Sequence, residues 1–357
     1  MAALLSMLWL SLFFHGVLSA PQVPCYFIFG DSLVDNGNNN RIASIARADY
    51  APYGIDFPDG PTGRFCNGRT TTDAIAELLG FDDYIPPYSA ASPNQLLTGV
   101  NFASAAAGIR DETGQQLGGR ISMNGQVQNY RTAVERVVDL LGDEDSAANH
   151  LSQCLFTVGM GSNDYLNNYF MPAFYSTGRQ YTPDQYADVL VQQYTGQLRT
   201  LYDYGARKVA VIGVGQVGCS PSELAQNNVR GGCVQRINSA IQIFNNKLRN
   251  LVVNFNSNLP GAKFTFINGY AIFEDIVRRA PQYGFTNTNT GCCGVGRNNG
   301  QITCLPLQTP CPNRDQYVFW DAFHPTEKVN VLFARRSYNA QSPNDAYPLD
   351  IARLARS

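Results

Sequence analysis

The sequence predicts an α/β fold with a doubly wound parallel sheet, and two observations carry this prediction. Short apolar runs of about four residues recur at wide intervals and are mostly bounded by Gly, Asn or Ser, as is typical of buried strands in a parallel sheet. Longer stretches with helical periodicity lie between them. Strands that alternate with helices along a chain favour this fold class. The five apolar runs are residues 26–29, 100–103, 155–158, 209–212 and 264–267.

Two of the intervening stretches show clear helical faces. The first stretch places six apolar residues on one side of a helix: Tyr186, Val189, Leu190, Tyr194, Leu198 and Leu201. The second does the same and is stopped by a Pro-Gly pair: Ile237, Ile241, Phe244, Leu248, Leu251, Phe255, then Pro260 and Gly261. In a sheet of this kind, ligands bind beyond the carboxyl ends of the strands, so the residues that follow each apolar run are the candidates for function.

Composition favours one domain. The 357 residues carry a net charge of −2, with no block of like charge and no Pro-rich linker, so neither a nucleic acid nor an anionic membrane surface is an expected partner. Residues 2–14 form an apolar run that is too short to span a bilayer and has the length of a signal-peptide core, and small residues follow it. We therefore expect a signal peptide over residues 1–20 and a single domain over 21–357; a buried N-terminal helix is the alternative.

If the protein is secreted, most of its nine cysteines should form disulfides, because the compartment is oxidising. An odd number leaves at least one cysteine free. Cys219 and Cys233 are expected to close one loop. A second group crowds a Gly/Asn/Pro-rich segment and predicts a stapled surface loop: Cys292, Cys293, Cys304 and Cys311. A zinc site is the alternative, but the spacing and the vicinal pair do not suit tetrahedral ligation. No metal is expected.

Ser32 is a candidate nucleophile because it ends the sequence Gly-Asp-Ser directly after the first apolar run. It could equally be a turn or N-cap residue. A serine nucleophile needs a base. Of the three histidines, His15 lies in the expected signal peptide and His150 is expected at the surface, which leaves His324. Asp321 precedes His324 by three residues and could orient its imidazole, or it could merely cap the following helix. Asp35 and the asparagines around it are expected to hold the loop after Ser32.

These segments together resemble the plant-type GDSL esterase/lipases of the SGNH hydrolase superfamily. The resemblance rests on four motifs in the family's order: Phe29-Gly30-Asp31-Ser32-Leu33, Asn101-Phe102-Ala103-Ser104, Gly161-Ser162-Asn163-Asp164, and Asp321-x-x-His324-Pro325-Thr326-Glu327. It implies a three-layer α/β/α sandwich with a five-stranded parallel sheet, similar to flavodoxin, and it implies ester hydrolysis or acyl transfer without a cofactor.

The resemblance also implies roles for individual residues. Ser32 is the implied nucleophile, His324 the general base and acid, and Asp321 its orienting partner. The implied oxyanion hole combines the backbone N–H of Ser32, a backbone N–H at Ala106 and the side-chain amide of Asn163. The family usually has a glycine where Ala106 stands, and Gly108 is the other candidate donor in this Ala-rich loop.

The expected function is therefore that of a secreted serine esterase or lipase acting on a small-molecule, lipid or polyester ester substrate, in the apoplast or cell wall if the source is a plant. No integral membrane span and no obligate protein partner are expected. Two alternatives are an extracellular acyltransferase that uses the same three residues and a silent secreted binding or defence protein. A Gly-x-Gly-x-x-Gly sequence at 213–218 suggests a nicotinamide oxidoreductase, but Cys219-Ser220-Pro221 follows where an uninterrupted helix is needed. The glycines are instead expected to shape a loop near the cleft.

Overall fold

The computed structural model describes residues 20–229 and 232–357, and its centre is a sheet with the strand order β1-β2-β3-β4-β7. The first four strands run parallel to one another, and β7 pairs with β4 in the antiparallel direction. Their registers align Gly30, Gly159, Ile212 and Ile267 side by side, so the four parallel strands end level at one edge. The strands are β1 (Tyr26–Gly30), β2 (Leu155–Gly159), β3 (Lys208–Ile212), β4 (Lys263–Ile267) and β7 (Ala346–Tyr347).

The expected fold class is confirmed, but the expected parallel strand over residues 100–103 is wrong. This segment is extended and runs beside β1, where Phe102 N donates to Ile28 O at 2.8 Å and Ile28 N donates to Val100 O at 3.2 Å. It forms only isolated bridges, because Gly30 N, which would continue the pairing to Phe102 O, donates to the Gln126 side chain at 3.0 Å instead. The short antiparallel β7, at the opposite edge, makes up the fifth strand of the sheet.

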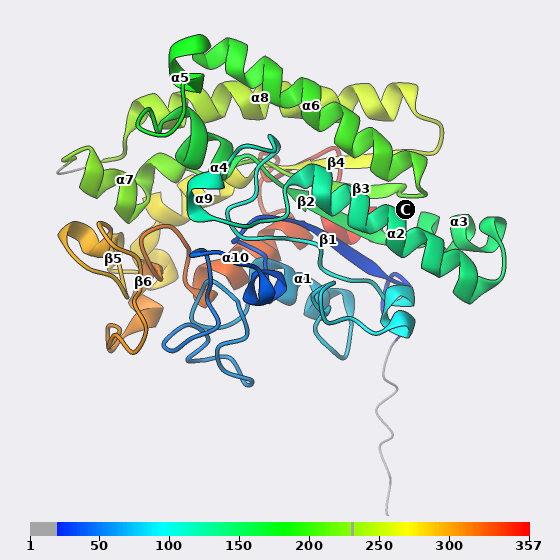
Figure 1. Ribbon diagram of the computed structural model, residues 1–357, viewed down its shortest axis with the longest axis horizontal. Helices are drawn as coiled ribbons and strands as arrows, with labels where there is room; N and C mark the ends of the chain where they lie inside the picture. The colour runs from blue at the N-terminus through cyan, green and yellow to red at the C-terminus, as the bar shows by residue number, and fades with distance from the viewer. Residues whose placement is uncertain (1–19, 230–231) are drawn as a thin grey trace, which may run out of the picture.

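Helices cover both faces of the sheet, with α6 and α8 above it and α1 and α10 below it in Figure 1. Alternate residues of β1 separate the two cores: Phe27 and Phe29 pack with the first helix layer, while Tyr26 and Ile28 pack with the second. The first layer contains α2 (Met123–Leu141), α3 (Glu144–Gln153), α6 (Pro183–Asp203) and α8 (Gln235–Asn258). The second contains α1 (Thr71–Leu79), α9 (Gly269–Arg278), α10 (Glu327–Tyr338) and α11 (Ile351–Ala355).

The two helical faces predicted from the sequence correspond to α6 and α8. Their apolar residues are buried, except Val189, which is half-buried. Shorter elements lie around the strand ends: α4 (Ser162–Asp164), α5 (Thr177–Gln180), α7 (Pro221–Gln226), and a separate two-stranded sheet of β5 (Asn287–Gly291) and β6 (Tyr317–Phe319). The second sheet leads directly into the segment that carries Asp321 and His324.

Four disulfides cross-link the fold. The expected Cys219–Cys233 bridge is present, and the crowded group forms two bridges, Cys292–Cys311 and Cys293–Cys304, which confirms a stapled loop. A fourth bridge, Cys25–Cys154, joins the residues that precede β1 and β2. Within the described ranges, Cys66 is the free cysteine, and it is buried.

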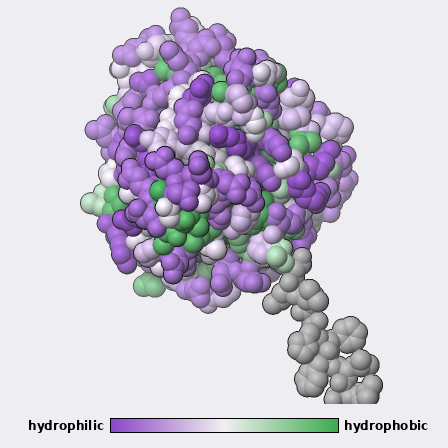
Figure 2. Space-filling model, turned by 90° about the vertical axis from the view of Figure 1, so that its right-hand side faces the viewer, coloured by the Kyte–Doolittle hydropathy of each residue, from purple (hydrophilic) through white to green (hydrophobic). Residues whose placement is uncertain are grey.

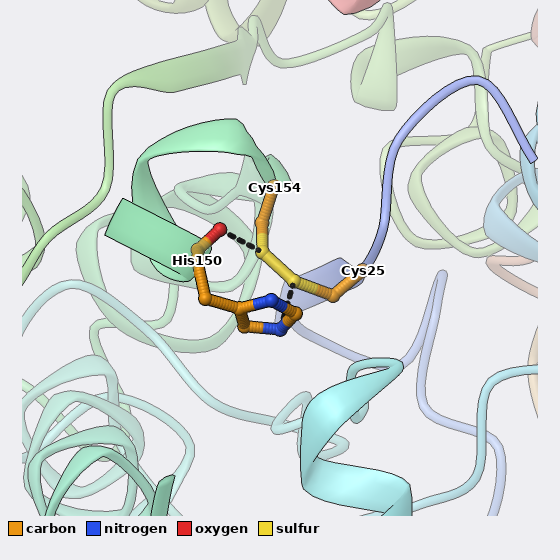
Figure 3. A group of neighbouring side chains, drawn as sticks. All are labelled: Cys25, His150 and Cys154. Atoms are coloured by element: carbon orange, nitrogen blue, oxygen red, sulfur yellow. Dashed lines mark hydrogen bonds between the residues drawn. A yellow bond between two sulfur atoms is a disulfide. The ribbon is translucent and has the colours of Figure 1, made fainter. Parts of the chain in front are cut away.

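His150, expected at the surface, lies in α3, where it is half-buried and packs beside the Cys25–Cys154 bridge, as Figure 3 shows. Its Nε2 lies 3.3 Å from Cys25 Sγ and 3.0 Å from Leu97 O. The ligand-type atoms of these three side chains lie within 4.8 Å of one another. Because the two sulfur atoms are bonded to each other, neither offers a thiolate to a metal ion.

No helix in the part of the chain that the structure describes is long and apolar enough to cross a membrane. The expected signal peptide falls almost wholly on residues 1–19, outside the described residues. The face of the molecule shown in Figure 2 is mainly hydrophilic, and its hydrophobic side chains gather in small patches.

Candidate active site

The structure brings Ser32, His324 and Asp321 together beyond the carboxyl end of β1. Ser32 Oγ lies 2.7 Å from His324 Nε2. On the other side of the ring, His324 Nδ1 lies 2.8 and 2.9 Å from the two carboxylate oxygens of Asp321. With the ring proton on Nδ1, that nitrogen donates to Asp321 and Nε2 accepts from the Ser32 hydroxyl. This is the hydrogen-bond relay that a serine nucleophile requires.

A tight turn between β6 and α10 presents the histidine. Asp321 Oδ1 accepts hydrogen bonds from the backbone N–H groups of Phe323 and His324, each at 2.8 Å. Trp320 N closes the turn by donating to His324 O at 2.8 Å. Thr326, not Asp321, occupies the N-cap position of α10. Asp321 therefore folds its own turn and holds the imidazole with the same carboxylate, and it does not act as a helix cap.

Two further side chains complete the surroundings of Asp321. Tyr53 donates its hydroxyl to Asp321 Oδ2 at 2.6 Å, and Thr303 Oγ1 donates to the same oxygen at 3.1 Å. Asp321 is fully buried, which alone would raise its pKa. The nearby His324 and the hydrogen bonds from His324, Tyr53 and Phe323 outweigh burial and hold the pKa of Asp321 below its ordinary value, so the carboxylate stays charged.

Sequence reasoning missed both Tyr53 and Thr303. Tyr53 is 268 residues from Asp321 in the chain, and it lies in a segment without a recognisable motif. It belongs to a small buried cluster with Phe65, Trp320 and the cysteines of the stapled loop. Thr303 precedes Cys304 directly, so the position of this cysteine in the crowded group was the one available signal. The stapled loop thus packs against the back of the histidine turn.

The Ala-rich loop lies against the loop that carries Ser32. Ser104 N donates to Gly30 O at 3.1 Å, and Ala105 N donates to Asp35 Oδ2 at 3.0 Å. Asn38 and Asn39 also bond to this loop, through Ala103 O at 2.7 Å and Ala105 O at 3.2 Å, so the asparagine run has the holding role expected of it. The two loops therefore form one hydrogen-bonded unit.

Two of the three expected oxyanion donors, the N–H groups of Ser32 and Ala106, belong to this unit, and the Asn163 side chain of α4 is bonded to it. Among the described residues, the backbone N–H groups of Ser32 and Ala106 have no hydrogen-bond partner. Ala106 has a φ of 63°, a left-handed conformation in which a glycine would be the ordinary choice. Asn163 donates one amide hydrogen to Ala107 O at 2.9 Å, and Asn167 donates to Asn163 Oδ1 at 2.7 Å. This orientation leaves one hydrogen of the Asn163 amide available to a ligand.

Two buried carboxylates, those of Asp35 and Asp164, accept hydrogen bonds from these loops. Asp35 accepts from the N–H groups of Gly37 and Asn38, in addition to Ala105. Asp164 accepts from Ile109 N at 2.8 Å and from the hydroxyl of Thr113 at 2.7 Å. Burial raises the pKa of each to about 6, although these hydrogen bonds partly oppose the shift.

A cavity of about 130 Å³ opens beside the serine–histidine pair. Its wall includes Leu33 and Val34, which follow Ser32, and Phe323 and Pro325, which flank His324. It extends past the carboxyl ends of β2 and β3 to the glycine-rich loop at 213–217, so the prediction that these glycines shape a loop near the cleft is confirmed. The dinucleotide alternative is not supported, since a short 3₁₀ turn at Val217–Cys219 follows the loop instead of a long helix.

A family model described as GDSL-like lipase/acylhydrolase matches residues 26–337. Three curated proteins of Arabidopsis thaliana are similar over nearly the whole chain. GDSL esterase/lipase At1g29660 is 64% identical over 95% of this chain and 93% of its own length. At4g18970 is 64% identical over 94% and 93%, and At1g29670 is 65% identical over 94% and 92%.

A solved structure of a gut microbial diltiazem-metabolizing enzyme aligns over 80% of this chain and 44% of that chain, with 14% identity and a TM-score of 0.34, which is too distant to bear on fold or function. The family model and the Arabidopsis relatives both span the Ser32 loop, the Asn163 segment and the histidine turn. The chain therefore belongs to the GDSL-like lipase/acylhydrolase family of hydrolases that act on ester bonds.

Proposed function

We propose that this protein is a secreted serine esterase or lipase that hydrolyses carboxylic esters through an acyl-enzyme intermediate. The observation that carries the proposal is the chain of short contacts from Ser32 Oγ through both nitrogens of His324 to the buried Asp321 carboxylate. In this mechanism Ser32 Oγ attacks the ester carbonyl carbon while His324 Nε2 takes the hydroxyl proton. His324 then gives that proton to the leaving alcohol, and the serine stays acylated.

Water completes the cycle in the second half of the reaction. His324 Nε2 takes a proton from the water as its oxygen attacks the acyl carbon, and the bond to Ser32 Oγ breaks as the serine recovers that proton. In both halves the carbonyl oxygen becomes an oxyanion. The N–H groups of Ser32 and Ala106 and the free hydrogen of the Asn163 amide would stabilise it, and each such donor is worth about 10²–10³ in rate.

Secretion is part of the proposal. The apolar run at 2–14 supports a signal peptide over 1–20 that leaves one domain over 21–357, and four disulfides in the structure fit an oxidising compartment. An extracellular location, which in a plant would be the apoplast or the cell wall, follows from this. The substrate would be a small ester, a lipid or a polyester that needs neither a cofactor nor a partner protein.

The test is hydrolysis of p-nitrophenyl acetate and butyrate by the purified protein and by the Ser32→Ala and His324→Ala variants. We expect kcat to fall by about 10⁴ or more in both variants, since each removes a member of the relay. Ser152→Ala and His150→Gln, which change residues of α3, are the matched controls and should retain activity. A folded wild type without hydrolysis would contradict the proposal. Ester exchange with an added alcohol that exceeds hydrolysis would favour the acyltransferase alternative.

A further inference from the structure

The cavity beside Ser32 is lined by uncharged residues and is mostly apolar. Leu33 and Phe323, which neighbour the reactive pair in sequence, are 39% and 37% exposed and form part of its wall. Large apolar side chains that stay exposed at a reactive centre mark a surface that an apolar ligand covers. The cavity therefore suits a hydrocarbon chain better than a charged or sugar group.

The three glycines at 213, 215 and 218 differ in what a side chain would meet. A Cβ atom at Gly213 would lie 2.7 Å from the Phe266 ring, and one at Gly218 would lie 2.6 Å from Asn238 Oδ1. Close packing therefore explains these two glycines. A Cβ at Gly215 would meet only the backbone oxygen of Gly269, at 4.0 Å, and Gly269 is itself part of the cavity wall. Packing thus gives no reason for a glycine at 215, where a side chain would instead take up cavity space.

The loop around Gly215 is held from both sides. Asn245 of α8 accepts from Val214 N at 2.9 Å and donates to Val214 O at 2.8 Å. Asn238, about two turns earlier in α8, accepts from Gly218 N at 2.9 Å. The Cys219–Cys233 disulfide fixes the end of the loop. Because this wall is anchored, a side chain added at 215 cannot be accommodated simply by displacement of the loop.

We propose that the cavity holds the acyl chain of the ester substrate and that Gly215 determines how long that chain can be. This inference rests on the proposed function, in which Ser32 carries the acyl group. The acyl group stays bonded to Ser32 Oγ through the intermediate, and the cavity wall begins with the next two residues, Leu33 and Val34. A chain attached to Oγ therefore has the cavity within reach, whereas the alcohol must be free to leave.

The experiment measures kcat/KM for p-nitrophenyl esters from acetate to dodecanoate with wild type, Gly215→Ala and Gly215→Val. Each methyl group added at 215 shortens the space, so we expect the loss to increase with acyl length and to be larger for valine. For octanoate relative to acetate, the ratio should fall by about 10-fold or more in Gly215→Val, as one methylene in a hydrophobic pocket changes discrimination by about 10–200-fold. Gly196→Val, on the exposed face of α6, is the matched control and should leave the ratio unchanged.

Two outcomes would overturn the inference. One is a Gly215→Val protein with wild-type thermal stability and an unchanged acyl-length profile. The other is a loss that follows the alcohol chain in a series of alkyl acetates, which would place the alcohol in the cavity. A wild type that hydrolyses none of these esters would instead refute the proposed function, so the two failures are distinguishable.

Discussion

At the scale of single residues, Asp321 combines tasks that usually belong to several groups. Its carboxylate accepts from two backbone N–H groups of its own turn, from the His324 ring and from the hydroxyls of Tyr53 and Thr303. A fully buried charge is tolerated only when it is paired and hydrogen-bonded in this way. The orientation of the histidine thus depends on residues outside the Ser32–His324–Asp321 relay.

Tyr53→Phe tests this dependence. Removing a hydrogen bond to a charged group costs about 1.5–3 kcal/mol, so the free energy of unfolding should fall by about that amount. Because the pKa of Asp321 is lowered in part by Tyr53, the carboxylate should become protonated at a higher pH in the variant, and activity should be lost sooner on acidification. We expect kcat to fall by about 10-fold with little change in KM.

The matched control is Tyr50→Phe, because Tyr50 belongs to the same region but donates to Cys304 O at 2.8 Å rather than to Asp321. Steady-state kinetics from pH 8 down to about pH 3, which covers the ordinary titration range of a carboxyl group, and thermal unfolding of both variants are the measurements. Equal kcat values and equal acid limits in the two variants would show that Tyr53 does not act through Asp321.

At the scale of elements, the loops after β1 and β2 owe their conformations to buried carboxylates rather than to regular secondary structure. Asp35 gathers backbone N–H groups from its own loop and from the Ala-rich loop. Asp164, which follows Asn163, binds the far end of the Ala-rich loop. The positions of the expected oxyanion donors therefore depend on hydrogen bonds to carboxylates. Because carboxylates titrate, these positions should respond to pH.

Asp164→Asn should show that sensitivity. The pKa of Asp164 is raised from its ordinary value to about 6, so the folded protein takes up a proton before the unfolded chain does as the pH falls through 6. Wild type therefore gains up to about 3 kcal/mol of stability from this group between neutral and acidic pH, at about 1.4 kcal/mol per pKa unit. The Tm of wild type minus the Tm of the variant should therefore increase as the pH is lowered from 7.5 to 4.5.

Asp143→Asn provides a control of opposite sign. Asp143 caps α3, and its hydrogen bonds from Ser146 lower its pKa, so the stability that it contributes is present above its ordinary pKa and is lost as the pH falls. The gap in Tm for this variant should stay constant or narrow on acidification. Parallel behaviour of the two variants would refute the role assigned to Asp164.

At the scale of the whole molecule, one disulfide lies where the parallel strands begin and another lies beside the histidine turn, near the carboxyl ends of the strands. Cys25–Cys154 joins the starts of β1 and β2, whereas Cys293–Cys304 lies in the loop that places Thr303 against Asp321. The first bridge closes 129 residues and the second closes 11. In the chain-entropy description these loops correspond to about 5 and about 3 kcal/mol of stability.

Replacing each pair by serine should separate stability from activity. The Cys25→Ser/Cys154→Ser protein should lose more thermal stability yet retain kcat at temperatures where it is folded. The Cys293→Ser/Cys304→Ser protein should lose less stability but show a reduced kcat, because Thr303 and the cluster around Tyr53 are released. Thermal unfolding and ester hydrolysis at 15 °C are the measurements. The reverse pattern would show that the stapled loop does not support the histidine turn.

Much of this fold could be predicted because buried parallel strands leave a strong signal in sequence. The runs at 26–29, 155–158, 209–212 and 264–267 match strands of the structure to within one residue at each end. The run at 100–103 has the same composition, and its failure to form a strand depends on the distant Gln126 side chain, which takes the hydrogen bond of Gly30 N and which composition does not reveal. The antiparallel β7 is two residues long and has no periodicity to detect.

The candidate site was predictable to the extent that each residue had a local motif. Ser32, Asn163, Asp321 and His324 stand in such motifs, and the structure brings Ser32, Asp321 and His324 into contact. Tyr53 was not predictable as part of the site, because its position depends on a contact between distant segments. The loop that includes Gly215 was expected near the cleft, but nothing in the sequence assigned a role to that glycine. Whether the singled-out residues perform the roles expected of them remains a prediction for the variants above.

Ser32 and His324 touch although 292 residues separate them in the chain. During synthesis, the serine emerges from the ribosome early and the histidine close to the end. A nascent or prematurely terminated chain would therefore carry a serine without its proton acceptor, and it would not hydrolyse esters through this relay. Ester hydrolysis by this protein should thus report only on chains that have been translated and folded in full.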